Sequence, residues 1–364
     1  MRDDTDTTAT AAVQAGLQLL SDICADRRYA TGAQLAVSVD GGVTACATVG
    51  LQVGDRPLKH DHLFNVWCAS KPIPAIVLMG LLENAGLPLA TPVSEIDVRH
   101  GNAIEASVGS LLNHSCGLRH PDLVTTNLMS FDDALSRARN IQDTAAPAFS
   151  EFAAGVIVVD LIEALAQRPA LSVIGDLLET HKLNADITFR VGDELLERPL
   201  KHFGFYITGL PVLARPLYSD ALAGMAQHNR EVMGAYLNAR GLAEFYRLTG
   251  MVLNGVRLAG FPTAEYLNDA VDNHRRARGH DRTLRKCCSF AAGFMTELAD
   301  HGYGSTISPR AIGHTGLVGS PFGAYDPDRR LAFAAILNGM TAAPEDCDHW
   351  RSDLIDAICE AVDG

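Results

Sequence analysis

The sequence predicts an α/β protein of the α+β type: a central antiparallel sheet flanked by helices, with an inserted, mainly helical lobe. Three observations support this prediction: a hairpin pattern near each end of the chain and helical patterns between them. We therefore expect residues 1–95 and 285–364 to build one sheet domain. Residues 96–284 then form a mainly helical domain, with a cleft between the two.

The chain begins with a predicted helix and a predicted hairpin. Apolar residues recur at helical spacing over residues 11–24. Residues 34–39 and 43–49 have strand patterns on either side of Asp-Gly-Gly, a short connection that is typical of hairpins. This part of the chain therefore predicts two paired strands with a helix beside them.

A buried helix is predicted next, over residues 64–83, because this segment is apolar on every side. Pro72 and Pro74 fall where missing amide donors cost least, so we expect the helix to begin near residue 68. Cys68 would then lie at the positive end of a buried helix.

The middle of the chain is mostly helical in pattern, and strands return near the C-terminus. Helices are expected over residues 108–112, 156–165, 171–179 and 238–253. Residues 189–220 show no clear period. Residues 320–325 and 331–337 predict a second hairpin, and a final amphipathic helix follows it.

Composition restricts the function classes. The 364 residues are 47% hydrophobic and 20% charged, which is typical of a globular protein of about two domains. A net charge of −13 disfavours nucleic acid and anionic membranes as partners. The acidic N-terminus lacks a secretory pattern and no run is long enough to span a bilayer, so we expect a cytoplasmic protein.

The eight cysteines form no metal-ligand spacing and no C-x-x-C pair. In a reducing compartment most cysteines are small buried apolar residues. Cys68 differs, because Lys71 follows it by three residues at the predicted helix start. Residues three apart share a helical face, and an ammonium together with a helix N-terminus favours the nucleophilic thiolate. Alone, the pattern also fits a core cysteine before a surface lysine.

Several motifs follow one another in a recognisable order. The segment around Cys68 and Lys71 resembles the S-x-x-K helix of the serine β-lactamase and penicillin-binding-protein superfamily, in particular its esterase and transesterase branch, with cysteine in place of serine. Further similar segments are residues 111–118 (LLNHSCGL), 183–189 (LNADITF), 238–243 (NARGLA) and 313–316 (GHTG). The resemblance covers about residues 30–340 and implies the β-lactamase/transpeptidase-like fold.

The resemblance also implies roles for individual residues. The backbone amides of Cys68 and Leu317 would form the oxyanion hole, whose donors are commonly worth about 2.7–4 kcal/mol each. His314, Gly316 and Trp67 would line the substrate site, with His314 holding a polar group. A strand histidine with an ordinary structural hydrogen bond is the alternative for His314.

The chain departs from this family at its second motif, Tyr-x-Asn. No tyrosine occurs between Tyr29 and Tyr206, and alignment of the following apolar helix places Glu151 at the start of the motif. Ser70 cannot replace the nucleophile in an S-x-x-K frame, because Ile73 stands three residues on. A thiol that is already ionised makes the tyrosine dispensable, and Glu151 could orient Lys71 or move protons. Glu151 could equally be a solvated loop carboxylate.

These features favour an acyltransferase that works through a thioester on Cys68, because thioesters react readily with amines and thiols relative to water. A cysteine-dependent esterase or amidase is one alternative, and a non-catalytic binding homologue is another. An engineered replacement of serine is disfavoured, since it would leave the second motif intact.

Expected partners are a small-molecule acyl donor and acceptor, with the donor a free ester or a thioester on coenzyme A or a carrier protein. The basic run at residues 274–278 fits either a solvated face or a contact with such an acidic donor. No phosphate loop or metal-ligand cluster occurs in the sequence, so no cofactor is expected.

Overall fold

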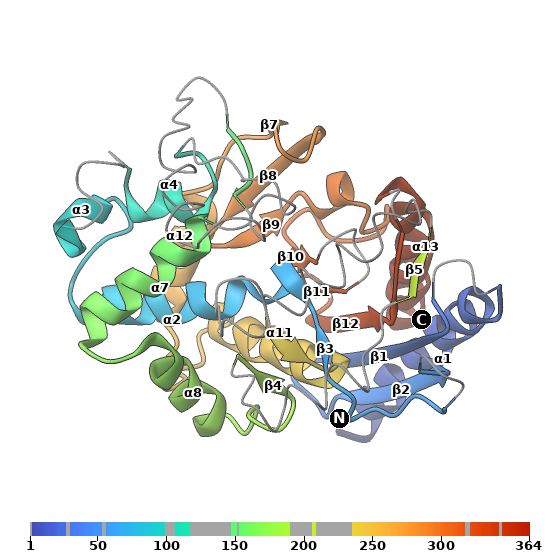
Figure 1. The fold of residues 1–364 in the computed structure, drawn as a ribbon. Coiled ribbons are helices and arrows are strands. Elements are labelled where there is room, and N and C mark those ends of the chain that lie inside the picture. The colour runs from blue at the N-terminus through green and yellow to red at the C-terminus, as the bar shows by residue number, and fades with distance from the viewer. Residues whose placement is uncertain are drawn as a thin grey trace.

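An antiparallel sheet runs through the protein (Figure 1). The computed structural model describes residues 2–26, 30–52, 56–98, 106–116, 147–150, 153–189, 206–208, 235–316, 321–341 and 344–364. Over these residues the sheet has eight strands in the order β2-β1-β12-β11-β10-β9-β8-β7. Their bounds are β1 Gly32–Val39, β2 Ala45–Gly50, β7 Gly279–His280, β8 Cys287–Ala291, β9 Phe294–Thr296, β10 Ile312–Thr315, β11 Phe322–Asp326 and β12 Leu331–Leu337.

Both ends of the chain meet in this sheet, as the two hairpin patterns predicted. Strand β1 pairs with β2 on one side and with β12 on the other, where Ala33 faces Leu337 and Val39 faces Leu331. Strand β11 pairs with β12 to form the second predicted hairpin. The prediction of one antiparallel sheet built from both termini is therefore confirmed.

Helices cover both faces of the sheet, so its central strands are apolar on both sides. In β12, Phe333 and Ala335 belong to one hydrophobic cluster, while Ala334 and Ile336 belong to the other. Successive strand side chains point to opposite faces, so this alternation assigns one cluster to each face. Helices α1 (Arg2–Asp26) and α13 (Pro344–Asp363) pack together against the first face.

The second face is covered by α11 (Ala239–Leu253), which contacts β1, β11 and β12. The side chain of Asn238 caps this helix by accepting the backbone N–H of Gly241 at 2.8 Å. The sequence-based division at residue 284 places α11 in the helical domain, whereas in the structure α11 packs on the sheet. Strand β7 likewise precedes that boundary yet pairs with β8.

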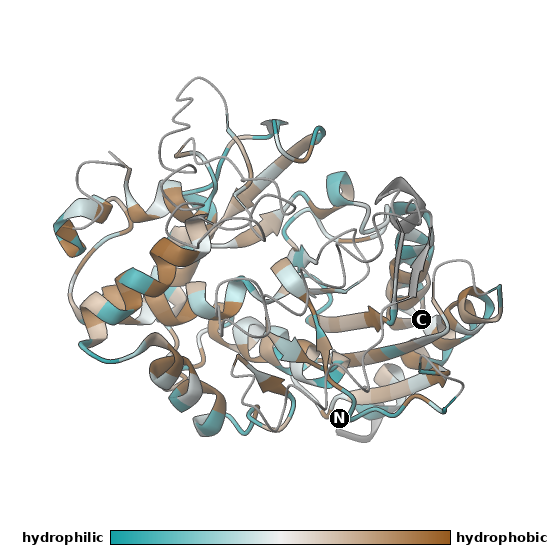
Figure 2. Cartoon of the chain, in the orientation of Figure 1, coloured by the Kyte–Doolittle hydropathy of each residue, from teal (hydrophilic) through white to brown (hydrophobic). Residues whose placement is uncertain are grey.

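The remaining helices gather beyond α11 around α2, which contacts both α7 and α8 (Figure 1). Helices α2 and α7 consist largely of hydrophobic residues, which are coloured brown in Figure 2. The helices are α2 Pro72–Asn84, α3 Val93–Ile96, α4 Val108–Leu112, α7 Ala153–Ala166, α8 Ala170–Thr180 and α12 Ala264–Asp272. Two short 3-10 turns are η1 Trp67–Ser70 and η3 Leu298–His301.

Two small sheets complete the described structure. One holds β3 (Phe64–Asn65), β6 (Tyr236–Leu237) and β4 (Ile187–Thr188), with β6 in the centre. The other pairs β5 (Tyr206–Thr208) with β13 (Gly339–Thr341) in parallel. Most of residues 189–220, whose pattern gave no prediction, lie outside the described residues. None of the described helices is long and apolar enough to cross a membrane.

Candidate active site

Cys68 lies in a 3-10 turn rather than in the first turn of an α-helix. The sequence placed the helix start near residue 68, but the α-helix begins at Pro72. Pro72 and Pro74 lack the N–H groups that would bond to the carbonyls of Cys68 and Ser70 in an α-helix. The tighter bond from the Lys71 N–H to the Cys68 carbonyl, at 3.0 Å, forms instead.

The turn that presents Cys68 is held from both ends. The residue before it, Trp67, has a left-handed backbone with a φ of 52°, which costs energy for a residue with a side chain. Its N–H is accepted by the Asn65 side chain at 2.9 Å, and β3 anchors this segment to β6. A strained conformation therefore persists because its surroundings hold it.

Ser70 stabilises the same turn through its hydroxyl. It donates to the carbonyl of Trp67 at 2.9 Å and accepts the backbone N–H of Ala235 at 2.9 Å. With its oxygen engaged on both sides and its side chain buried, Ser70 serves as a structural bridge between η1 and β6.

The thiol of Cys68 is half-buried, unlike several other described cysteines. Burial raises the pKa of the Cys24 thiol to about 12 and the pKa values of Cys288 and Cys359 to about 11. These three thiols are protonated at neutral pH and enclosed, so they are poor nucleophiles. Cys68 is the described cysteine that lies on the strained turn before α2.

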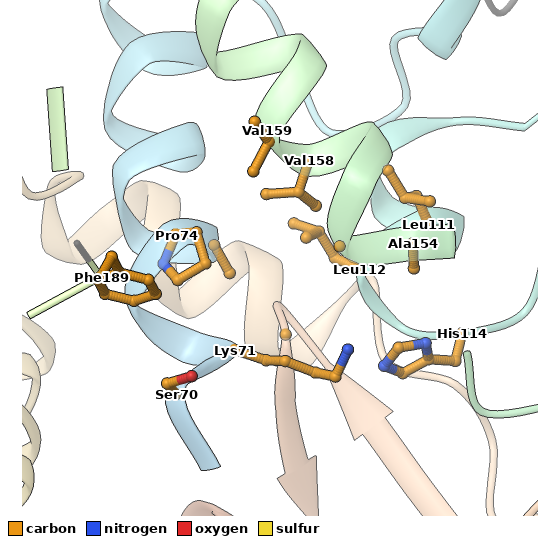
Figure 3. A pocket seen from close by; sticks show the side chains of 13 residues that line it. Ser70, Lys71, Pro74, Leu111, Leu112, His114, Ala154, Val158, Val159 and Phe189 are labelled. Carbon is orange, nitrogen blue, oxygen red and sulfur yellow. The ribbon is translucent and has the colours of Figure 1, made fainter. Parts of the chain in front are cut away.

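Lys71 extends its amine toward His114 (Figure 3). The Nζ atom donates to the carbonyl of Ser150 at 3.3 Å and lies 5.6 Å from the ring centroid of Phe149. The ammonium thus has a backbone acceptor and an aromatic face. Glu151, expected beside Lys71, and Leu317, expected in the oxyanion hole, both lie outside the described residues.

His114 is a site residue that the sequence argument did not single out, although it lies within the LLNHSCGL segment. Its ring packs 4.5 Å from Phe149 and 5.0 Å from Phe290, and its Nδ1 accepts the N–H of Ser150 at 3.3 Å. Burial, followed by the nearby Lys71 cation, holds the pKa of His114 well below its usual value. The imidazole is neutral, with its proton on Nε2, and it adds no charge beside Lys71.

His314 is enclosed in the structure. It is 0% exposed, its Nδ1 lies 2.7 Å from the carbonyl of Thr315, and its Nε2 has no partner among the described residues. Burial lowers the pKa of His314 to about 3. The ring contacts Phe149 and Phe290, so it packs behind the Lys71 segment.

Gly316 brings the end of β10 against the turn of Cys68. A Cβ atom on Gly316 would lie 2.4 Å from the carbonyl oxygen of Val66, so only glycine fits this approach. Strand β10 therefore runs beside η1, as the resemblance implied. Trp67 is 4% exposed, and its Nε1 is buried without a partner in the described part of the chain.

A buried ion pair supports these residues from behind. Arg276 donates to the Asp281 carboxylate at 2.8 Å and to the carbonyl of His114 at 3.3 Å. Asp281, 0% exposed, also accepts the N–H of Phe149 at 2.8 Å. The pair therefore fixes the two segments that carry His114 and Ser150.

The three arginines of the basic run at residues 274–278 form ion pairs within the protein. Arg275 binds Glu297 at 2.6 Å, Arg278 binds Asp300, and Arg276 is buried with Asp281. These ion pairs favour a structural role for the run over contact with an acidic donor.

A narrow pocket opens beside Lys71, between α2, α4 and α7 (Figure 3). The space in it that is open to the centre of a water molecule is about 40 Å³. Most of its walls are apolar, and they include Pro74, Leu111, Leu112, Val158, Val159 and Phe189. Within the described residues, no group of three or more His, Cys, Asp or Glu side chains is placed to hold a metal ion.

Comparisons with known proteins agree with this geometry. A penicillin-binding-protein homologue from Caulobacter crescentus is 20% identical over 96% of this chain and 97% of its own, with a TM-score of 0.74. A family VIII carboxylesterase is 19% identical over 96% and 97%, with a TM-score of 0.72. The hydrolase EstCE1, described as having promiscuous acyltransferase activity, is 16% identical over 98% and 99%, with a TM-score of 0.70.

These similarities show the β-lactamase/transpeptidase fold that the motifs implied. No curated protein sequence matches the chain. The model of the Beta-lactamase family matches residues 12–357, which is most of the sequence. The chain therefore belongs to the β-lactamase family, whose members include esterases, amidases and transpeptidases.

Proposed function

We propose that this protein is an acyltransferase in which Cys68 carries the acyl group as a thioester. The observation that carries the proposal is the half-buried thiol on a strained turn directly before α2, with Lys71 on the same turn. Ser70, the neighbouring hydroxyl, is engaged in two structural hydrogen bonds. The thiol is therefore the proposed nucleophile of this turn.

The proposed reaction has two steps. The Cys68 thiolate attacks the carbonyl carbon of a donor ester or thioester; the C–S bond forms, and the leaving group departs as its alcohol or thiol after taking up a proton. A nucleophile on the acceptor then attacks the thioester, the C–S bond breaks, and the acceptor's proton returns to the site. The amides of Cys68 and Leu317 would stabilise the oxyanion in both steps.

Lys71 is the proposed proton carrier and electrostatic partner of the thiolate. Glu151 would orient Lys71. It is the residue after Ser150, whose carbonyl accepts a hydrogen bond from the Lys71 amine. Trp67 and Gly316 would shape the wall next to the nucleophile, because Gly316 packs against the carbonyl of Val66. His314 would hold a polar substrate group only after a local opening, since it is enclosed here.

The chemistry of sulfur favours transfer over hydrolysis. Relative to water, amines and thiols attack a thioester more readily than they attack an oxyester. A related fold already combines the two reactions, since EstCE1 is described as a hydrolase with promiscuous acyltransferase activity. We propose a small-molecule acceptor and a donor that is a free ester or a thioester on coenzyme A or a carrier protein, with the protein acting in the cytoplasm.

Intact-mass spectrometry with a panel of acyl thioesters and esters tests the nucleophile and the donor class together. The expected result is one acyl adduct per chain, mapped by peptide digestion to Cys68 and lost in Cys68→Ala. The variant Cys287→Ala, which removes an exposed thiol, should keep the adduct. Absence of an adduct with every donor, or an adduct that persists in Cys68→Ala, overturns the proposal.

Two further measurements separate the alternatives. Partition of one acyl-enzyme between water and an added amine distinguishes transfer from hydrolysis, and a predominance of hydrolysis at millimolar amine supports the esterase or amidase. Alkylation by iodoacetamide at neutral pH tests for a non-catalytic homologue. A rate for Cys68 no higher than that of free cysteine would favour the binding role.

A further inference from the structure

We propose that His114 is a positioning residue for Lys71, which it orients through the backbone of Ser150. This inference deepens the proposed function and rests on it, because Lys71 is the proposed partner of the Cys68 thiolate. His114 and Lys71 line the same pocket, and the lysine amine extends toward the imidazole ring (Figure 3). In this role His114 acts on the lysine and not on the substrate.

Two hydrogen bonds in series connect the imidazole to the lysine amine. The backbone N–H of Ser150 donates to His114 Nδ1 at 3.3 Å, and the carbonyl of Ser150 accepts Lys71 Nζ at 3.3 Å. The hydroxyl of Ser150 also accepts the backbone N–H of Ala154, in the first turn of α7, at 3.0 Å. His114 and α7 thus hold Ser150 from two sides, and together they set the direction of its carbonyl.

The structure holds His114 itself in one orientation. Its carbonyl accepts a hydrogen bond from Arg276, and its ring packs against Phe149 and Phe290. Its backbone is left-handed with a φ of 58°, which is uncommon for a residue with a side chain. Such strained conformations persist where the surroundings impose them, and they are frequent at functional sites. The Nδ1 acceptor is therefore presented to Ser150 at a fixed place.

The neutral form of His114 is the form that can do this. Only an unprotonated Nδ1 accepts the N–H of Ser150. Burial, followed by the positive charge of Lys71, holds the pKa of the imidazole well below its usual value, so Nδ1 remains an acceptor at neutral pH. His114 therefore acts on the lysine through geometry and not as a counter-charge.

The same contacts keep the lysine amine near the hydrophobic cluster on which the nucleophile packs. Cys68 packs against the cluster that contains Phe149. Lys71 Nζ lies 5.6 Å from the centroid of the Phe149 ring, and the His114 ring lies 4.5 Å from that centroid. Without its acceptor, Ser150 would no longer hold the amine at this ring, and the thiol would lose the cation that favours its ionised form.

Two substitutions at residue 114 separate the hydrogen-bond acceptor from the ring. His114→Phe keeps an aromatic ring in the same place and removes the acceptor for the Ser150 N–H. His114→Asn removes the ring but keeps an acceptor, the amide oxygen, and asparagine tolerates the left-handed backbone.

His181→Phe is the matched control. His181 follows α8, its ring packs 5.3 Å from that of Phe261, and its Nε2 lies 2.8 Å from the carbonyl of Ala259. The control therefore also replaces an imidazole that contacts a phenyl ring and a backbone group. His181 does not belong to the described lining of the Lys71 pocket.

The first measurement is the rate at which iodoacetamide alkylates Cys68 as a function of pH, followed by peptide mass mapping. The exposed thiol of Cys287 is the internal reference. In His114→Phe the midpoint of the Cys68 profile should rise by about one pH unit, because the thiolate loses a neighbouring cation. The midpoint should return toward the parent value in His114→Asn and equal it in His181→Phe.

The second measurement is the second-order rate of Cys68 acylation by the acetyl thioester of N-acetylcysteamine. His114→Phe should lower this rate at least about tenfold, since a misplacement of about 1 Å can cost about 100-fold. His114→Asn should recover most of the loss, and His181→Phe should show none. Far-UV circular dichroism and urea unfolding establish that each variant is folded, and His114→Ala replaces His114→Phe if the latter is not.

The outcomes distinguish this inference from the proposed function. An unchanged midpoint and acylation rate in folded His114→Phe, even with a loss of stability, overturns the positioning role and leaves the Cys68 nucleophile in place. Equal losses in His114→Asn and His114→Phe also overturn it, because the acceptor would then make no difference. A raised midpoint in His114→Phe, without acylation of any variant or of the parent protein, supports the positioning of Lys71 and overturns the transferase.

Discussion

The buried carboxylate of Asp281 accepts the backbone N–H of Phe149 at 2.8 Å, which ties the segment beside Lys71 to a loop 132 residues further along the chain. Asp281 also pairs with Arg276, whose guanidinium reaches the carbonyl of His114. One ion pair therefore holds two described segments beside the Lys71 amine, those of Phe149 and His114. The turn that carries Cys68 and Lys71 depends on this arrangement, because Ser150, the residue after Phe149, accepts the hydrogen bond of the Lys71 amine.

Asp281→Asn is expected to lower the free energy of unfolding by about 3–5 kcal/mol. Both carboxylate oxygens accept hydrogen bonds, from Arg276 and Phe149 at one oxygen and from the amides of Thr283 and Leu284 at the other. An asparagine supplies one acceptor, presents a donor to the remaining N–H groups, and leaves Arg276 buried without its counterion. Urea denaturation measures the change.

Asp176→Asn is the matched control for this measurement. Asp176 pairs with Arg168 at 2.9 Å, but both side chains are more than half exposed. An exposed pair contributes about 0–1 kcal/mol. Equal losses in the two variants would show that the Arg276–Asp281 pair is not the anchor inferred above.

Three buried histidines should make the protein sensitive to mild acid. Burial is the main cause that lowers the pKa values of His301 and His314 to about 3, and it also holds the pKa of His114 well below its usual range. Between about pH 6.5 and these lower values the unfolded chain binds protons that the folded chain does not. Stability is therefore full above pH 6.5 and falls as the pH is lowered, by up to about 1.4 kcal/mol per pH unit for each histidine.

His301→Leu tests this pH dependence. Both ring nitrogens of His301 are buried and have no partner in the described structure, and Lys286 and Arg351 lie close enough to disfavour its protonation. The slope of unfolding free energy against pH, measured from pH 6 to 4.5, should fall by about 1.4 kcal/mol per unit in this variant. His60→Gln, which removes an exposed imidazole, is the control, and an unchanged slope in His301→Leu would contradict the prediction.

Part of the sheet could be predicted from the sequence because four of its strands have recognisable local patterns. Strands β1, β2, β11 and β12 are rich in apolar residues, and a short turn joins the two strands of each hairpin. Strands β8 and β9, which are five and three residues long, were not predicted from their pattern. Helix α11 was recognised as a helix, but its position on the sheet depends on contacts such as that between Gly250 and Tyr325, which sequence spacing does not reveal.

From residue spacing alone, the candidate site was predictable only where it is local in the chain, whereas the approach of β10 to η1 was implied by the family resemblance. Cys68 and Lys71 are three residues apart and share one turn, so their pattern was visible. The groups that surround Lys71 come from Ser150 and His114, and their support comes from Arg276 and Asp281. Contacts between residues so far apart in the chain leave no periodic pattern in the sequence. The residues next to Arg276 in the sequence also do not show whether its side chain is buried or exposed. The prolines that produce the 3-10 turn were visible, yet they were read as a helix start.

Two helical glycines should respond in opposite ways to alanine. In α11, a Cβ atom on Gly250 would lie 2.2 Å from the ring of Tyr325, so Gly250→Ala should cost about 1–3 kcal/mol through overpacking against the sheet. In α8, nothing lies within 4 Å of the corresponding atom on Gly175. Gly175→Ala should therefore gain about 0.5–1 kcal/mol from helix propensity. Thermal and urea unfolding of both variants measure the difference, and a gain at Gly250 would refute the close packing of α11 on the sheet.

Replacement of Cys68 by serine tests whether this site has moved from general-base to thiolate chemistry. A serine hydroxyl must lose its proton as it attacks, and general-base assistance is typically worth about 10²–10⁴-fold in rate. The chain has no tyrosine between Tyr29 and Tyr206, so the family's second motif has no tyrosine here to assist a hydroxyl. We expect Cys68→Ser to fold normally, because serine has the same shape as cysteine with a smaller terminal atom and the position is half-buried, and to acylate at least about 100-fold more slowly than the parent protein. Intact-mass spectrometry of reactions quenched at set times gives the acylation rates of both proteins at the same donor concentration.

Acylation of Cys68→Ser at the parent rate would contradict this prediction. It would mean that Lys71 and its neighbours still activate a hydroxyl, and that the thiol confers no advantage at this turn.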